Sequence, residues 1–239
     1  MTQIADGPAR IKRFYERAEP KANSGAFVLT LDDRPAKTRA GARLATTSQK
    51  LAYAMAGEWN DQSEYIDFRM MPLTRLLMTA IDLAPSDRTT WEQTVLDHLR
   101  SDLVCYRAAS PAGLVERQQK AWDPLLDWAG SVLGTKLAVT SGIGYVNQPE
   151  EPISECARLL ADASDTEILA LKTAVDISGS AVIGLAAWKT DCPADELFRL
   201  SRVDEDFQID QWGRDAEAEA RETAMAAEFA AARRFFRLL

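Results

Sequence analysis

The chain has 239 residues, of which 46% are hydrophobic and 27% charged, a composition that is ordinary for a globular protein and excludes long disordered or fibrous segments. No apolar run approaches the roughly 20 residues of a membrane-spanning helix, so we expect no membrane insertion. Residues 1–50 hold ten Lys and Arg against five Asp and Glu, yet the whole chain has a net charge of −8. Nucleic-acid modules are usually basic, so we expect no nucleic-acid partner.

The N-terminal region predicts mixed secondary structure. Residues 9–18 have the pattern of a short basic helix, whereas residues 26–47 predict a β-meander of two or three strands with turn chemistry at 32–35. Thr46 and Gln49 form a possible capping box where the helical remainder begins. So few strands are not stable alone, and we therefore expect helices to cover one face of the meander.

The rest of the chain is helical in pattern. Leu51, Met55 and Trp59 recur at helical spacing, and a second helix is expected to open at Pro72 and close at Pro85. The next two helices are expected at residues 87–106 and from residue 111, the second with a kink or restart at 123–124. After an extended interruption at 135–149, further helices are expected at residues 152–163, 165–176, 179–189, 193–215 and 216–239. The sequence thus predicts an α+β fold, with a small N-terminal domain over residues 1–85 and a larger helical bundle over residues 86–239.

Residues for metal or triad chemistry are sparse. The three cysteines, Cys105, Cys156 and Cys192, are far apart, and His98 is the only histidine. We therefore predict no zinc site, and an odd, sparse cysteine count suits a reducing compartment. His98 has acidic and hydroxyl neighbours within residues 97–102, but a triad usually draws its members from separate elements. His98 is expected to be structural or exposed.

Nucleotide chemistry is not supported either. Gly142 and Gly144 lack the third glycine and the helix start of a dinucleotide loop, and no Gly-Lys-Ser/Thr run occurs. Glu58 pairs with Asp61 in sequence and residues 204–206 are all acidic, yet acid–base catalysis needs a pocket that perturbs such groups. We predict no cofactor, and no motif supports an enzyme.

One segment is more unusual than a solvated helix surface. Leu200, Val203 and Phe207 predict an apolar face on the helix that contains residues 204–206. A second stripe mixes acid, amide and indole groups, and its members are Glu205, Gln208, Trp212 and Asp215. Such a stripe is typical of a binding surface or of a buried hydrogen-bond network, and the sequence favours neither.

Motifs along nearly the whole chain resemble, in order, those of one protein family. The matching segments are Arg13-Phe14-Tyr15, residues 31–38 followed by Gly41, residues 51–62 with Glu58, Trp59 and Gln62, residues 71–74, 80–82, 102–107 and 119–125, Ser178-Gly179-Ser180, and residues 204–215. The family is the ATP synthase assembly chaperone that handles the alpha subunit, found in mitochondria and alpha-proteobacteria. The ordered set is specific, with mild departures at Asn60, where an acid is common, and Phe207, where tryptophan is common.

The resemblance implies a non-enzymatic function. Members of the family bind the free alpha subunit, whose apolar beta-facing surface would otherwise self-associate, until the beta subunit displaces them, and they use no nucleotide of their own. It also implies that the C-terminal bundle is mainly orthogonal. By analogy, the residues expected to bind the partner are Asp204, Glu205, Gln208, Trp212 and Asp215. The residues expected to be structural are Trp59, Gln62, Pro72 and Trp122.

Two alternatives remain beside the chaperone: a hydrolase that uses Glu205 and Asp215, and a generic protein-interaction scaffold. We expect the free chaperone to be a monomer. The N-terminus has no signal or transit pattern, so we expect a bacterial cytoplasmic protein, or a mitochondrial matrix protein if the chain is eukaryotic and lacks its transit peptide.

Overall fold

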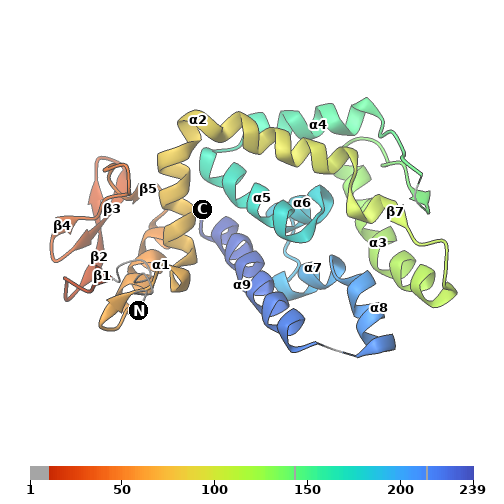
Figure 1. The fold of residues 1–239 in the computed structure, drawn as a ribbon. Helices are drawn as coiled ribbons and strands as arrows, with labels where there is room; N and C mark the ends of the chain where they lie inside the picture. Colours follow the sequence, from red (N-terminus) through yellow and green to blue (C-terminus); the bar gives the residue numbers. More distant parts are fainter. Residues whose placement is uncertain (1–10, 143, 214) are drawn as a thin grey trace, which may run out of the picture. The chain divides into compact units, whose positions relative to one another are not determined.

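The computed structural model describes residues 11–142, 144–213 and 215–239, and these residues form an α+β fold (Figure 1). The chain divides into two compact units. We call residues 11–82 with Leu238–Leu239 the sheet unit, and residues 83–237 the helical unit. The predicted α+β class, a small sheet region followed by a helical bundle, is confirmed. The division between the units and the boundary expected after residue 85 both lie within one long helix.

The sheet unit is built around one central strand. Strand β3 pairs antiparallel with each of the other three strands of its sheet, β2 on one side and β4 and β5 on the other. Ser24 and Gly25 join β2 to β3 with positive φ angles of 48° and 85°, as a tight hairpin turn requires. The strands are β2 (Ala18–Asn23), β3 (Ala26–Leu31), β4 (Arg34–Pro35) and β5 (Ala45–Thr46).

The basic helix expected at residues 9–18 is wrong where the structure describes it; residues 9 and 10 lie outside the described part. Ile11–Lys12 is strand β1, paired with strand β6 (Tyr65–Ile66). The Arg13 side chain donates to the carbonyls of Asn60 at 3.2 Å and of Gln62, which ties the segment to residues nearly fifty positions away. These tertiary contacts override the local helical pattern.

Helix α1 (Gln49–Asn60) covers the sheet and packs against β2 and β3. Leu51, Met55 and Trp59 form its buried face, as the spacing predicts. The capping box expected at Thr46 is wrong, because the N-cap is Ser48, whose hydroxyl accepts from the Leu51 amide at 3.2 Å. Thr46 lies in β5 instead and accepts a hydrogen bond from the Ser48 amide.

Two helices continue through prolines that were expected to interrupt them. Helix α2 (Pro72–Arg100) contains Pro85, and helix α3 (Ala112–Val132) contains Pro124 without restarting. A proline removes one intrahelical hydrogen bond, and both halves of α2 carry enough buried apolar residues to offset that loss. The fully or nearly buried residues are Leu77, Ala80 and Ala84 before Pro85, and Trp91, Val95 and Leu99 after it.

The remaining elements belong largely to the helical unit, and α6 lies at its centre, packed against α3, α5 and α7 (Figure 1). The helices are α4 (Glu150–Ala161), α5 (Asp165–Ser178), α6 (Ala181–Lys189), α7 (Ala194–Leu200), α8 (Val203–Trp212) and α9 (Ala216–Leu238). The short elements are η1 (Phe68–Met70) in the sheet unit, η2 (Leu103–Cys105), and the parallel pair β7 (Tyr106–Arg107) and β8 (Thr140–Ser141). Among the described residues, no helix combines the length and apolarity that crossing a bilayer requires.

The single helix expected at residues 193–215 is two helices, α7 and α8. Ser201 ends α7, because its amide and its hydroxyl both donate to the Phe198 carbonyl, at 3.0 and 2.7 Å. The side chain thereby competes with continued helical bonding. The expected face of Leu200, Val203 and Phe207 is therefore divided between two helices.

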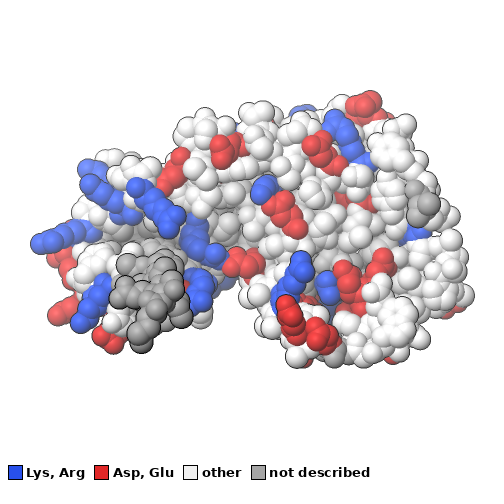
Figure 2. Space-filling view, in the orientation of Figure 1, with Lys and Arg blue, Asp and Glu red and all other residues white. Residues whose placement is uncertain are grey.

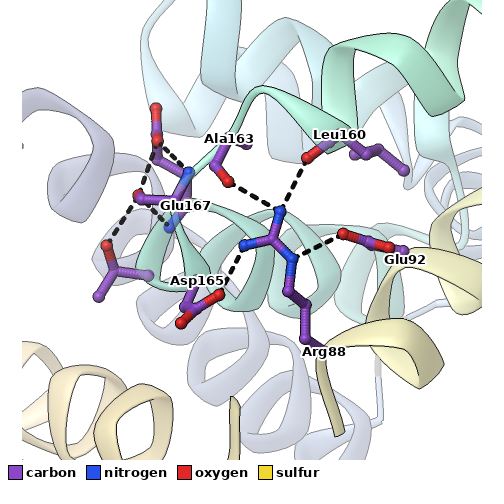
Figure 3. A network of polar contacts seen from close by, with 8 residues as sticks. Arg88, Glu92, Leu160, Ala163, Asp165 and Glu167 are labelled. Atoms are coloured by element: carbon purple, nitrogen blue, oxygen red, sulfur yellow. Dashed lines mark hydrogen bonds and ion pairs between the residues drawn. The ribbon is translucent and has the colours of Figure 1, made fainter. Parts of the chain in front are cut away.

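Arg88 joins three helices of the helical unit (Figure 3). From α2 it pairs with Glu92 at 2.8 Å and donates to the carbonyls of Leu160 at 3.1 Å and Ala163 at 2.8 Å, where α4 ends. It also pairs with Asp165, in the first turn of α5, at 2.5 Å. One guanidinium thus satisfies carbonyl groups left over at the end of one helix and an acid at the start of the next.

Ser164 and Glu167 form a capping box that starts α5 (Figure 3). The Glu167 carboxylate accepts from the Ser164 amide at 2.8 Å and from the Trp188 indole at 3.1 Å. Burial raises the pKa of Glu167, but the Ser164 and Trp188 donors outweigh it, and the net pKa is lowered. The carboxylate therefore stays ionised in the cap.

Candidate partner-binding surface

The inner face of α8 is fixed to α3 by a buried amide. The Gln118 side chain, only 1% exposed, donates to Asp204 at 2.6 Å and accepts from the Ala108 amide at 2.8 Å. A buried amide with both ends satisfied specifies one position for the groups it contacts. Asp204, expected to bind a partner, is therefore used to position α8.

Arg117 makes the second link between α3 and α8. Its guanidinium lies 5.2 Å from the centre of the Phe207 ring and pairs with Asp210 at 2.7 Å. Phe207 and Asp210 are three residues apart and share one face of α8. This face packs on α3, so the opposite face of α8 is left to solvent.

The outer face of α8 carries three of the residues expected to bind a partner. The Glu205 side chain is 46% exposed and pairs with Arg202 at 3.0 Å. Gln208 is exposed, and Trp212 is 80% exposed. A buried hydrogen-bond network is therefore excluded for Gln208 and Trp212. Acidic side chains gather over α8 and the adjoining end of α9 (Figure 2).

Asp215 does not continue this stripe. Helix α8 ends at Gly213, whose φ of +88° is in the region that favours glycine. Beyond it, the Asp215 carboxylate accepts from the Ala218 amide at 3.1 Å and its carbonyl accepts from the Glu219 amide at 3.0 Å. Asp215 thus caps α9, a role the helical spacing could not indicate because the spacing assumed one unbroken helix.

A pocket of about 270 Å³ opens beside Glu205. It combines apolar side chains with two carboxylates, Asp176 and Glu205, and one cation, Arg202. The other lining residues are Leu103, Ile177, Ser178, Gly179, Ser201 and Met225. The outer face of α8 therefore borders a hollow as well as open solvent, and both could receive side chains of a partner.

Asp102 organises the interior of the helical unit, a role that the sequence analysis missed. Its fully buried carboxylate accepts from the Ser180 hydroxyl at 2.6 Å and from the Val182 and Val104 amides at 3.0 and 3.2 Å. It thereby caps η2 and helps to start α6. Burial raises the pKa of Asp102 to about 6, although these donors oppose the rise. The signal in the sequence was its place directly before a short turn.

The residues expected to be structural are placed in the interior or at helix ends. Trp59 is 5% exposed, and the rings of Tyr15 and Phe68 meet it edge-on. Gln62 donates to the Glu58 carbonyl at 3.0 Å and accepts from the Asp67 amide at 2.7 Å. Pro72 is the first residue of α2, and buried Trp122 donates from its indole to the Leu200 carbonyl at 2.7 Å.

Glu58 adds a cap that sequence reasoning treated only as half of an acidic pair. Its two carboxylate oxygens accept from the Leu73 and Thr74 amides, each at 2.8 Å. These amides belong to the first turn of α2, where backbone donors have no intrahelical partner. The segment around Trp59 therefore both fills the core and starts the next helix.

The arrangement offers little for catalysis. Glu205 lies in the first turn of α8 and Asp215 beyond its other end, so roughly 10–15 Å of helix separates them and they cannot share a substrate as a carboxylate pair. His98 contacts the Thr94 carbonyl of its own helix at 2.9 Å. Burial raises the pKa of the Cys105 and Cys156 thiols to about 12, which makes them poor nucleophiles. No metal-ligand cluster is formed by the described residues.

Comparisons with known proteins identify the family. The model of the ATP12 chaperone protein family matches residues 12–130. The crystal structure of Atp12 from Paracoccus denitrificans is 34% identical with a TM-score of 0.90, over 95% of this chain and 98% of that one. The chain belongs to the ATP12 chaperone family. The resemblance inferred from the sequence motifs is confirmed.

Two further structures agree with this membership. An aspartate-to-lysine mutant of the Paracoccus Atp12p is 33% identical with a TM-score of 0.90, over 95% of this chain and 97% of that chain. Atu1473 of Agrobacterium tumefaciens, a proposed chaperone, is 35% identical with a TM-score of 0.90, over 95% of this chain and 85% of that chain. ATP12 proteins are assembly chaperones and not enzymes, so the hydrolase alternative is wrong.

Proposed function

We propose that this ATP12-family chaperone binds the free alpha subunit of ATP synthase through the outer face of α8, and shields its beta-facing surface until the beta subunit displaces it. The observation that carries the proposal is Trp212, which is 80% exposed beside Glu205 and Gln208. Tryptophan is enriched at the centres of protein interfaces, and holding so large an apolar group in water is unfavourable. A partner surface would cover it.

The charge of α8 supports the same role. Its first turn holds Asp204, Glu205 and Asp206, of which Asp204 is engaged with α3. Glu205, on the outer face of α8, would meet backbone donors or basic side chains of the alpha subunit, and would suppress contacts with acidic proteins. Trp212 would supply affinity, and Glu205 would supply orientation.

The test compares two exposed aromatic residues of the helical unit. Trp212→Ser should weaken binding of purified alpha subunit by about 2 kcal/mol, some thirtyfold, and should raise the chaperone concentration that prevents alpha aggregation, followed by light scattering. Tyr145→Ser is the control, because Tyr145 is 69% exposed but lies outside α8. Equal effects of the two variants would contradict the proposal. Binding of many lysate proteins without preference for alpha would instead support the generic scaffold.

A further inference from the structure

In a short hairpin of the sheet unit, every large exposed side chain is cationic. Residues 36–44 turn back on themselves, with Lys37 opposite Arg43. Two backbone hydrogen bonds flank this pair: the Thr38 amide donates to the Ala42 carbonyl at 2.8 Å, and the Leu44 amide donates to the Ala36 carbonyl at 2.9 Å. Lys37 and Arg43 are therefore a non-hydrogen-bonded pair, the kind whose side chains approach most closely. Like charges in directly opposite positions destabilise a hairpin.

No ion pair in the described part of the chain compensates this repulsion. Lys37, Arg39 and Arg43 form no ion pair among the described residues. The Asp82 carboxylate lies at the hairpin, where it accepts hydrogen bonds from Thr38 and Ala40, and the two acids that precede the hairpin in sequence are engaged elsewhere. Asp33 pairs with Lys21. Asp32 accepts from the backbone amides of residues 16 and 17, at 3.0 and 2.9 Å. The nine residues of the hairpin therefore carry a charge of +3, which the single carboxylate of Asp82 offsets only in part.

The backbone that carries the cations is also held in place. Asp82 of α2 accepts from the Thr38 hydroxyl and, at 3.1 Å, from the Ala40 amide, which fixes the turn. Ala36 and Leu44, 5% and 0% exposed, anchor the base of the hairpin in the core. Figure 2 shows Lys and Arg side chains gathered over the region that Figure 1 labels β3, β4 and β5. Because its backbone is already fixed, the hairpin loses little backbone entropy when an anionic ligand binds.

We propose that hairpin 36–44 binds an acidic segment of a partner polypeptide. The residues between the cations are Thr38, Ala40, Gly41 and Ala42, so no large apolar side chain is available to enter a bilayer, as membrane-surface binding usually requires. The net charge of −8 opposes approach to an extended anionic surface such as a membrane. A short acidic peptide avoids that cost, because it need extend only over the hairpin. This surface is separate from the α8 surface proposed above and does not depend on it.

The experiment compares two variants, each of which lacks three positive charges at a different place in the sheet unit. Lys37→Gln, Arg39→Gln and Arg43→Gln are combined in one variant. The control combines Lys12→Gln, Arg17→Gln and Arg69→Gln, three exposed cations that pair with local acids. The probe is fluorescein-labelled hexaglutamate, and binding is followed by fluorescence anisotropy at low salt. We expect about tenfold weaker binding for the hairpin variant, from three exposed charge contacts, and less than twofold change for the control.

Two results would overturn the proposal: no binding of hexaglutamate to the wild type, whether or not phosphatidylglycerol vesicles bind, or equal losses in both variants. Thermal melting gives a second readout. Because the like-charge pair is destabilising, the hairpin variant should melt no lower than the wild type. If the hairpin variant does melt lower, hexaglutamate binding is instead compared between the wild type and the single variants Lys37→Gln and Arg43→Gln. A failure here leaves the Trp212 experiment unaffected, since that experiment uses alpha subunit and another surface.

Discussion

At the scale of single residues, Trp59 of the sheet unit and Asp102 of the helical unit stabilise the fold through different interactions. Trp59 contributes apolar contact, with Tyr15 and Phe68 against its ring. Asp102 contributes hydrogen bonds, but it keeps a carboxylate away from water, which is costly. The first contribution is independent of pH and the second is not, so the two residues can be distinguished by experiment.

Trp59→Ala should lower the free energy of unfolding by about 3–5 kcal/mol, because it leaves a cavity where the indole was. Tyr53→Ala is the matched control, since Tyr53 lies on the same helix but is 58% exposed. Its effect should be within about 0.5 kcal/mol. Urea unfolding of both variants measures the difference, and equal effects would show that Trp59 does not act through the core.

Asp102→Asn should change how stability depends on pH. The carboxyl has a pKa of about 6 when folded, against an ordinary 3.8. Between pH 4 and 6 the folded chain therefore holds a proton that the unfolded chain has released, and stability falls as the pH rises. The wild type should lose about 3 kcal/mol over this window relative to the variant, which cannot titrate.

Urea unfolding of wild type and Asp102→Asn at several pH values between 4 and 7 tests this directly. Ser180→Ala removes a donor that favours the ionised carboxylate. It should therefore move the midpoint of the pH dependence upward. A constant difference between wild type and Asp102→Asn across the window would contradict the raised pKa.

At the scale of elements, the order of the helices was easier to predict than their ends. The capping box at Ser164 was predictable because both partners lie within four residues. The passage of α2 through Pro85 was not, because the buried contacts that sustain it come from residues distant in sequence. The break between α7 and α8 involves the Ser201 hydroxyl, and the end of α8 at Gly213 is what separates Asp215 from the α8 surface.

Glu205→Lys should abolish binding of the alpha subunit and leave the fold intact. Losing one partner of a charged contact within an interface costs about 2–5 kcal/mol, whereas the exposed pair with Arg202 is worth at most about 1 kcal/mol. Melting should therefore fall by only a few degrees. Glu155→Lys is the control, because Glu155 also makes an i,i+3 pair with an arginine, Arg158 of α4, although in the reverse order along the chain. Lowered melting with retained binding would assign Glu205 to the fold instead.

At the scale of the whole molecule, the sequence predicted the α+β class and the family, while single positions depended on distant contacts. Strand β1 forms because Arg13 reaches carbonyls around Gln62, across some fifty residues. Asp102 acts on Ser180, farther still along the chain. Charge was predictable, because it needs no contacts: residues 83–237 hold 16 Lys and Arg against 26 Asp and Glu.

That acidic excess leads to a prediction about kinetics. If α8 receives basic groups of the alpha subunit, the field of the acidic helical unit should steer the encounter, and steering weakens as salt screens the charges. The association rate of wild type with alpha should fall about tenfold between roughly 0.05 and 0.5 M NaCl, while the dissociation rate changes less. Glu205→Gln should show a shallower dependence, and Tyr145→Ser the wild-type one. Stopped-flow fluorescence measures both rates. An association rate that does not depend on salt would contradict electrostatic steering, and recognition would then depend on the contact at Trp212.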